Sequence, residues 1–407
     1  MKSAEPGTAE FWAELARPLL RKKATPCYLF SSAPIAQSLA QLDAAFTGLP
    51  ITHWLSVKTQ PLPALLRWWN SLGRPIEVVS ELELQLTLQM GCPPERILIN
   101  GPAKHRWLIR HPLPRLNVNF DSVAEATALG TLARRMHWRC GVRLNTRCEF
   151  DTDAPEFPTQ FGMTESELGE ALAILVEKRV TVEIAHFHLR SNVASHVDYL
   201  AAVNEGLGIL TRLGCQPAVL DIGGGFPSPD VTIRKGARLD ASFSLNSLNL
   251  ALRQIRNRFP FLKEIWMENG RWLSGRSGAL LIRVLDAKQR GVNRNLICDG
   301  GRTMNSLMSV WENHRILTLP ERSATPCMTT VNGPTCMAFD KLARRPLPSD
   351  LRAGDHLLWL DAGAYHLPWE TRFSHGLCAV YWHDGCTLQQ VRAPETFTDW
   401  FRQWRGS

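Results

Sequence analysis

Thr52-His53-Trp54-Leu55-Ser56-Val57 is a short apolar run that ends at Lys58, and apolar residues at helical spacing follow it at Leu62–Leu72. Such a run predicts a buried strand, and apolar residues at i, i+3 and i+4 predict an amphipathic helix. Similar strand-like runs recur at Ile76–Ser80, Ile97–Asn100, Leu116–Phe120, Cys140–Leu144, Ile184–Leu189, Val219–Ile222 and Glu264–Glu268. Helical patterns lie between them at Glu81–Met90, Val123–Met136, Glu165–Lys178 and Tyr199–Leu213. This alternation predicts an α/β fold, a closed (β/α)8 barrel rather than a doubly wound open sheet.

The pattern changes at about residue 280, where strand-like runs follow one another without long helical patterns. These runs are Leu280–Ala287, Asn295–Cys298, Thr329–Val331, His356–Leu360, Leu377–Trp382 and Thr387–Arg392. They predict a second domain built as a β-barrel or β-sandwich. A helix predicted at Thr8–Leu20 precedes a strand-like run at Pro26–Phe30, which we expect to join that domain. The predicted division is a barrel at residues 36–280 and a β domain formed by residues 1–35 and 281–407.

The composition indicates a globular protein with two ordinary domains, because 407 residues are 44% hydrophobic and 21% charged. The sequence shows neither a signal peptide nor an apolar run long enough to cross a bilayer, so we expect a cytoplasmic protein. Ten cysteines without CxxC or zinc-ligand spacing indicate reduced thiols. The net charge of +8 comes from scattered basic residues, which argues against a nucleic-acid partner.

Polar residues follow the predicted barrel strands at the end where active sites of this fold lie. In chain order they are Lys58, Ser80, Glu83, Arg143, His188, Gly223–Gly225 and Glu268. Lys58 leaves an apolar strand, and a partly desolvated amine is a good nucleophile, although a surface lysine is the simpler alternative. The three glycines would let backbone N–H groups approach a phosphate, or they form a plain tight turn. Their spacing is not that of a dinucleotide site.

Three further motifs carry candidate chemistry. Glu268-Asn269-Gly270-Arg271 places a carboxylate at a strand end, where it could keep a pyridine nitrogen protonated or form a surface ion pair. His186-Phe187-His188 predicts two imidazoles on one strand face, but no third metal ligand has a supporting spacing. Cys336 follows Gly333-Pro334-Thr335 and could act as a general acid or be an inert thiol. Tyr365, one of four tyrosines, could bind a phosphate or simply pack.

In this order the segments resemble the fold-type III decarboxylases that use pyridoxal 5'-phosphate (PLP), the group of diaminopimelate, ornithine and arginine decarboxylases. The resemblance covers roughly residues 26–376. It implies an alanine racemase-like barrel and a head-to-tail homodimer with shared active sites. It implies that Lys58 holds PLP as a Schiff base, that His188 stacks on the ring, that Arg143 lies near the ring and that Glu268 pairs with the pyridine nitrogen. Cys336 of one subunit would return a proton to the substrate's Cα in the active site of the other, after CO2 has left. The implied phosphate ligands are Ser191, Gly223, Gly224, Gly225, Gly270, Arg271 and Tyr365.

Departures from the family pattern bear on the substrate, and they make Arg190, Met337 and Asp340 candidate substrate-binding residues. The residue after the cysteine is usually acidic and binds a distal amine, but here it is Met337. Asp340 matches the family and could keep some amine recognition. Arg190 replaces the glycine of the usual His-x-Gly-Ser. We therefore expect decarboxylation of a modified amino acid with an anionic group, such as a citryl-linked diamino acid in siderophore biosynthesis or another specialised pathway.

Three alternatives stay open at this point. One is a decarboxylase of free diaminopimelate, ornithine or lysine. A second is an amino-acid racemase on the same fold, against which Glu268 and the Gly-Pro-Thr-Cys segment argue. The third is a PLP-binding regulator of the antizyme-inhibitor type without activity, which the presence of Lys58, Glu268 and Cys336 together disfavours.

Overall fold

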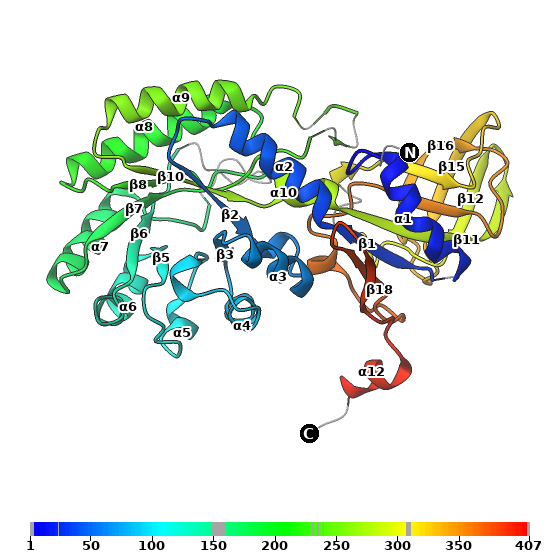
Figure 1. The fold of residues 1–407 in the computed structure, drawn as a ribbon, viewed down its shortest axis with the longest axis horizontal. Coiled ribbons are helices and arrows are strands. Elements are labelled where there is room, and N and C mark those ends of the chain that lie inside the picture. Colours follow the sequence, from blue (N-terminus) through cyan, green and yellow to red (C-terminus); the bar gives the residue numbers. More distant parts are fainter. Residues whose placement is uncertain are drawn as a thin grey trace. The chain divides into compact units, whose positions relative to one another are not determined.

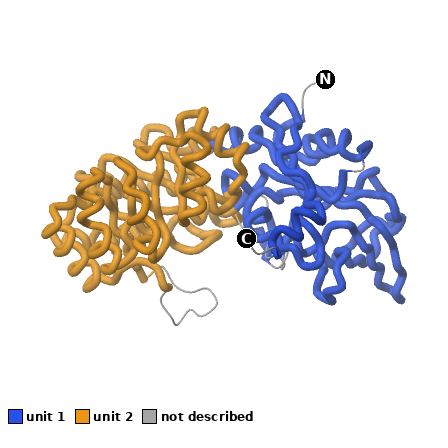
Figure 2. The backbone as a smooth tube through the Cα atoms, turned by 90° about the horizontal axis from the view of Figure 1, so that it is seen from below, with its two compact units in different colours: residues 1–39, 228–239, 272–407 blue, residues 40–227, 240–271 orange. Residues whose placement is uncertain are grey.

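The computed structural model describes residues 4–22, 24–147, 159–229, 231–233, 236–238, 240–306 and 311–404. The chain divides into two compact units, drawn in different colours in Figure 2. The barrel unit consists of residues 40–227 and 240–271, and the β unit of residues 1–39, 228–239 and 272–407. Segment 228–239 lies within the predicted barrel region but belongs to the β unit, where β9 (Thr232–Ile233) pairs with β13 (Glu312–Asn313).

The barrel unit contains a closed barrel of parallel strands in the order β10-β2-β3-β4-β5-β6-β7-β8, which confirms the predicted fold class. Its strands are β2 (Ile51–Ser56), β3 (Ile76–Val78), β4 (Ile97–Ile99), β5 (Asn117–Phe120), β6 (Arg139–Arg143), β7 (Val182–His186), β8 (Val219–Asp221) and β10 (Glu264–Asn269). Large apolar side chains from five of these strands pack together in one buried cluster, formed by Trp54, Leu98, Ile184, Val219 and Trp266. A barrel filled in this way is a solid core, so chemistry is confined to its ends.

The helices of the barrel unit lie around the outside of the strands (Figure 1). Helix α10 (Arg271–Ser274) begins at the last residue of the barrel unit and otherwise belongs to the β unit. The barrel helices are α2 (Ser32–Ala45), which begins in the β unit, α3 (Pro63–Ser71), α4 (Glu81–Gln89), α5 (His105–Leu108), α6 (Val123–Arg135), α7 (Glu165–Glu177), α8 (His196–Arg212) and α9 (Leu245–Arg258). Serine caps open four of them: Ser80, Ser122, Ser195 and Ser244 each accept a hydrogen bond from a first-turn N–H. Such caps satisfy backbone donors that a helix leaves unpaired, so each turn from strand to helix is sharp.

The β unit is built on a sheet of nine strands, with the path β16-β15-β12-β11-β1-β18-β19 and with β14 and β17 beside it. The strands are β1 (Cys27–Ser31), β11 (Gly278–Arg290), β12 (Asn293–Cys298), β14 (Ile316–Leu319), β15 (Pro326–Asn332), β16 (Lys341–Pro348), β17 (His356–Trp359), β18 (Ala379–His383) and β19 (Leu388–Arg392). As predicted, the N-terminal strand joins this sheet, pairing with β11 and β18. Helix α1 (Ala9–Arg21) buries Trp12 against the same core, and a short helix, α12 (Phe397–Arg402), follows β19.

Some sequence predictions need correction. β7 ends at His186, so His188 lies in the following loop and the two imidazoles do not share a strand face. β16 was missed because Arg344, Arg345 and Pro346 interrupt any apolar alternation. The nine cysteines among the described residues are free thiols, as expected, and Cys148 lies outside the described residues. None of the described helices has the length and apolar character needed to cross a membrane.

Candidate active site

Lys58 stands at the carboxyl end of the barrel, in a 3-10 turn (Val57–Thr59) directly after β2. Its Nζ atom lies 3.2 Å from Oε1 and 3.3 Å from Oε2 of Glu77, a fully buried residue of β3. The lysine side chain is 32% exposed, so the amine stays accessible from solvent. Ser56 donates a short hydrogen bond to the same carboxylate. The ends of two neighbouring strands therefore position one reachable amine.

A chain of buried amides connects Glu77 with the far side of the barrel. Asn100 donates to Glu77 Oε1 at 3.3 Å and, by a shorter bond, to Glu268 Oε1. Asn119 donates to Asn100 Oδ1 at 3.0 Å and to Asp221 Oδ2 at 3.3 Å. Amides can serve as donor and acceptor at once, so they can satisfy several buried carboxylates together.

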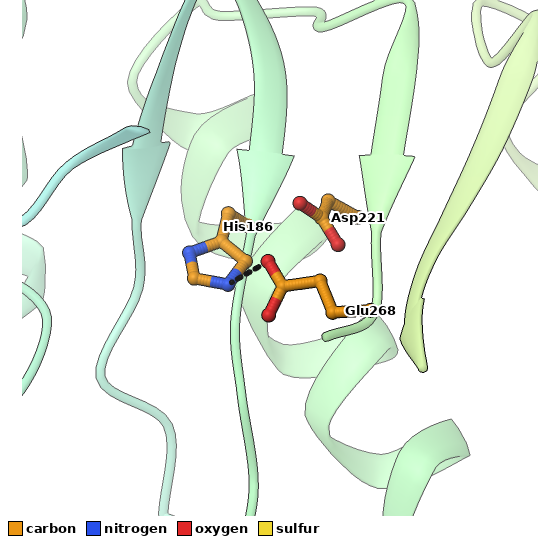
Figure 3. Close-up of side chains that lie close together, drawn as sticks. All are labelled: His186, Asp221 and Glu268. Carbon is orange, nitrogen blue, oxygen red and sulfur yellow. Dashed lines mark ion pairs between the residues drawn. The ribbon is translucent and has the colours of Figure 1, made fainter. Parts of the chain in front are cut away.

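His186, Asp221 and Glu268 meet at the ends of β7, β8 and β10, and Figure 3 shows their side chains converging. One ligand-type atom of each residue lies within 4.8 Å of the others, and all three residues are buried. His186 Nε2 lies 3.2 Å from Glu268 Oε1. The sequence offered no third partner for the histidines, because the carboxylates come from strands far along the chain.

Burial and neighbouring charges shift the pKa values of these three side chains in different directions. Burial raises the pKa of Asp221 well above its usual range, and the charge of Glu268 raises it further. Burial alone would also raise the pKa of Glu268, but His186, His188 and Lys58 hold that pKa well below its usual range. Burial lowers the pKa of His186. The cluster therefore pairs a carboxyl group whose surroundings favour the ionised form, Glu268, with one whose surroundings favour the protonated form, Asp221.

His188 faces the loop formed by Gly223, Gly224 and Gly225. The Gly224 N–H donates to His188 Nδ1 at 3.1 Å, so the ring proton must be on Nε2. Burial, with the positive charge of Lys58 adding to it, lowers the pKa of His188 to about 4. A Cβ atom at position 224 would lie 2.3 Å from the Glu268 carbonyl oxygen, so only glycine allows the loop to approach β10 this closely.

The other barrel residues predicted for the site have different surroundings. Arg143 ends β6, with Nη1 3.7 Å from Asp121 Oδ1 and the guanidinium over the Phe161 ring. Gly270 packs on the turn that carries Lys58, since a Cβ there would be 2.4 Å from Thr59 Cγ2. Arg271 is almost fully buried and opens α10, and Ser191 is exposed in the loop after β7. Arg190 forms a short ion pair with Asp198 in the first turn of α8.

The remaining predicted residues belong to the β unit. Cys336 is exposed and Met337 is half-buried in the turn between β15 and β16. Asp340 is buried and accepts hydrogen bonds from the Arg302 N–H at 2.6 Å and from Thr335 N–H and Oγ1 at 3.1 and 2.6 Å. Both oxygens of its carboxylate are thus engaged inside the turn.

Tyr365 stacks on Trp369, with the ring centres 5.5 Å apart. Its backbone has a φ of +65°, which is uncommon for a residue with a side chain and is concentrated at functional positions. The turn before it is held by hydrogen bonds from the Ala362 N–H to the Gly278 carbonyl at 2.8 Å and from the Gly363 N–H to the Gly275 carbonyl at 3.0 Å.

Sequence reasoning missed several site residues, namely Glu77, Asn100, Asn119 and Asp121, and it gave Asp221 no role. A signal was present, since each lies within or directly after a short strand of otherwise buried apolar residues. Buried polar side chains need partners, so a polar residue in such a strand marks a place where others must converge. Which partners those are depends on the order of strands around the barrel.

Comparison with known proteins supports a single family. The family model described as "Pyridoxal-dependent decarboxylase, pyridoxal binding domain" matches residues 33–275. A diaminopimelate decarboxylase of Actinosynnema pretiosum is 28% identical over 84% of this chain and 80% of its own length. A chloroplastic ornithine decarboxylase of Nicotiana glauca is 26% identical over 88% and 83%.

Solved structures have the same fold. The crystal structure of diaminopimelate decarboxylase from M. jannaschi aligns with a TM-score of 0.82 at 21% identity, covering 97% of this chain and 94% of that one. The Helicobacter pylori diaminopimelate decarboxylase complexed with L-lysine aligns with a TM-score of 0.81 at 22% identity, covering 95% and 98%.

The barrel unit fits the cofactor that this family uses. It offers an accessible amine at Lys58, a carboxylate at Glu268 that stays ionised, and a glycine loop in which Gly223 and Gly225 have φ values of +65° and +90°. These are the groups needed for a carbonyl carbon, a pyridine nitrogen and a phosphate. The chain belongs to the pyridoxal-dependent decarboxylases of fold type III, enzymes that remove the carboxyl group of amino acids with the help of PLP.

Proposed function

We propose that the reaction takes place at the carboxyl end of the barrel, with Lys58 as the covalent anchor of the cofactor. The observation that carries this proposal is the network that joins Lys58, Glu77, Asn100 and Glu268. PLP, when bound, withdraws electrons from the substrate Cα and so allows the carboxylate to leave as CO2. The ionised Glu268 would hold a proton on the ring nitrogen, and Asn100 and His186 would orient that carboxylate.

The other barrel residues would hold the cofactor in place. His188 is neutral near pH 7 and presents a flat ring beside the glycine loop, which suits it to stacking. Arg143 would lie near the ring. The phosphate region is proposed to be held by Ser191, Gly223, Gly224, Gly225, Gly270, Arg271 and Tyr365. The N–H groups of Gly223 and Gly224 donate within the protein, to Asp221 Oδ1 at 3.0 Å and His188 Nδ1 at 3.1 Å, so these two glycines would serve by allowing close approach of the loop.

Cys336 is proposed to return a proton to the Cα position after CO2 has left. Its exposure on a turn of the β unit supports a role in the active site of a second subunit, and thus a head-to-tail homodimer. A test is to mix Lys58→Ala chains with Cys336→Ala chains, each inactive alone. If the sites are shared, half of the dimers in an equimolar random mixture are heterodimers with one intact site in two, so the mixture recovers about a quarter of the wild-type activity. No recovery in verified mixed dimers would contradict sharing.

The substrate is proposed to be an amino-acid conjugate without a free distal ammonium group, such as a citryl-linked diamino acid of siderophore or other specialised biosynthesis. Met337 supports this proposal, because it stands where the family usually has an acid and its thioether cannot compensate the charge of a buried ammonium group. Three protein donors already occupy the carboxylate of Asp340, which argues against its replacing the missing acid. Arg190 gives no support for an anionic substrate, because Asp198 neutralises it.

A second candidate is a decarboxylase of free diamino acids. It is favoured by the relatives, which are named diaminopimelate and ornithine decarboxylases. Under this alternative, an acid other than Asp340 would bind the distal amine of the substrate.

The two candidates are separated by CO2 release from free lysine, ornithine, arginine and diaminopimelate and from their acylated or citryl-linked forms. The first proposal predicts a higher kcat/KM for conjugates and a gain for free diamino acids in Met337→Glu. Met328→Glu is the matched control, because Met328 is an exposed methionine of the same unit. A wide preference of the wild type for diaminopimelate would contradict the first proposal.

A further inference from the structure

Every carbonyl of the glycine loop is held by a hydrogen bond. The Gly223 carbonyl accepts from the Glu268 N–H at 2.8 Å, and the Gly225 carbonyl accepts from the Val193 N–H at 2.9 Å. The Gly224 carbonyl accepts from the phenol of Tyr199 at 2.6 Å. Two of the three donors are backbone groups, so Tyr199 is the one that a substitution can remove.

Tyr199 is well placed to act as a permanent donor. It lies in the first turns of α8, is fully buried and packs edge-on against Phe226 with ring centres 5.7 Å apart. Burial raises the pKa of its phenol well above the ordinary value, so the hydroxyl keeps its proton at every working pH. The Gly224 residue that it contacts is buried as well.

The direction of this hydrogen bond determines where the next N–H points. A trans peptide unit is planar, with its C=O and N–H on opposite sides. Because Tyr199 holds the Gly224 carbonyl toward α8, the Gly225 N–H of the same peptide unit is directed away from α8. The Val193 N–H, in the loop before α8, holds the Gly225 carbonyl, so the Phe226 N–H of that peptide unit is directed away from Val193. Consecutive N–H groups turned to one side form a concave site for an anion.

We propose that Tyr199 is a positioning residue for the cofactor's phosphate, which it serves by fixing the orientation of the Gly224–Gly225 peptide. Because the residues on both sides of this peptide are glycines, neither has a side chain of its own that would restrict rotation of the peptide. Without the phenol, the buried Gly224 carbonyl has lost its partner and the peptide can turn. The inference rests on the proposed assignment of the glycine loop to the phosphate.

The test compares the binding affinity for PLP with that for pyridoxal, which lacks the phosphate. The purified holoenzyme is stripped of its cofactor and then titrated with each compound. The variants are Tyr199→Phe and, as a matched control, Tyr28→Phe. Tyr28 is also a fully buried tyrosine whose phenol donates to a backbone carbonyl, that of Met304 in the β unit. Cofactor affinity is read from absorbance and from dissociation after dilution, and folding from the thermal midpoint.

The expected result is that Tyr199→Phe binds PLP about tenfold more weakly, the loss of about one hydrogen bond, and binds pyridoxal as the wild type does. Tyr28→Phe should leave both affinities unchanged. Equal weakening of PLP and pyridoxal, no weakening of either, or failure of Tyr199→Phe alone to fold would each overturn the inference. Equal wild-type affinity for PLP and pyridoxal would instead contradict the assignment of the loop to the phosphate, and the inference would fall with it.

Discussion

The amine of Lys58 and the carboxylate of Glu77 form an ion pair at the ends of adjacent barrel strands, with 3.2 Å between Nζ and Oε1. The carboxylate is fully buried and the amine is partly exposed. The buried carboxylate of Glu77 therefore positions the partly exposed amine of Lys58. Through Asn100 the same carboxylate is connected to Glu268, so the two groups proposed to hold opposite ends of the cofactor share one hydrogen-bond network.

Replacing Glu77 by glutamine should lower kcat by roughly 100-fold, because a misplacement of Lys58 by about 1 Å has an effect of that order. The cofactor should still bind, since Lys58 itself is intact. Steady-state kinetics and the absorbance of the purified holoenzyme measure the two effects. Glu264→Gln is the control: Glu264 also forms an ion pair, with Arg139, but begins β10 at the opposite end of the barrel. An equal loss of kcat in both variants would show that Glu77 supports the structure of the barrel and has no specific effect on the position of Lys58.

Replacing Asp221 by asparagine should stabilise the protein at high pH. The folded-state pKa of Asp221 is raised, so its contribution to stability is present below the unfolded value and is lost as pH rises toward the folded value. The wild-type free energy of unfolding should therefore fall by up to about 1.4 kcal/mol per pH unit through this one group. Denaturant midpoints at pH 5 and pH 8 measure the slope, which the asparagine variant should lack. Asp286→Asn, at an exposed site, is the control and should retain the slope.

His53 should contribute to acid unfolding. Burial lowers its pKa from 6.5 to about 4 in the folded protein, so between these values the unfolded chain binds the proton first. Stability is consequently lost as pH falls through this window, by roughly 3 kcal/mol at its full extent. His53→Gln, which can still accept the Asn269 amide hydrogen bond, should show a weaker acid transition. The exposed His375→Gln is the control, and an identical acid transition in all three proteins would contradict the prediction.

Replacing Asp340 by asparagine should loosen the turn that carries Cys336. The carboxylate accepts three hydrogen bonds there, and an amide can accept only at its one oxygen. We expect kcat to fall by roughly 10- to 100-fold, with a smaller change in KM, because a proposed proton donor loses its alignment.

Asp384→Asn is a close control for Asp340→Asn. Asp384 accepts from the Cys386 and Thr387 N–H groups, both at 2.8 Å, next to another exposed cysteine. Its replacement should leave kcat unchanged. If Asp340→Asn lost affinity for a substrate amine with kcat preserved, Asp340 would bind substrate after all.

The local sequence pattern predicted the eight barrel strands and five of the helices around them, but not α2, α5 or α9. Strands buried on both faces are continuous apolar runs, and helices with one buried face show a 3.6-residue period, so neighbouring residues alone reveal both. The positions of Lys58, His188 and Glu268 near strand ends followed from the same reasoning. The limits were those of any local pattern: β7 ends at His186 rather than continuing to His188, and β16 shows no alternation at all.

The amino-acid sequence by itself determined the alternation of elements, the family and the set of chemically active residue types. Only the tertiary structure decided which of these residues meet. Asn100 reaches Glu268, 168 positions later in the chain, because β10 closes the barrel against β2 and β8. The ionisation of Asp221 and the pairing of Arg190 with Asp198 were settled in the same way. Electrostatic and hydrogen-bond energies depend on distance and burial in space, which separation along the chain does not encode.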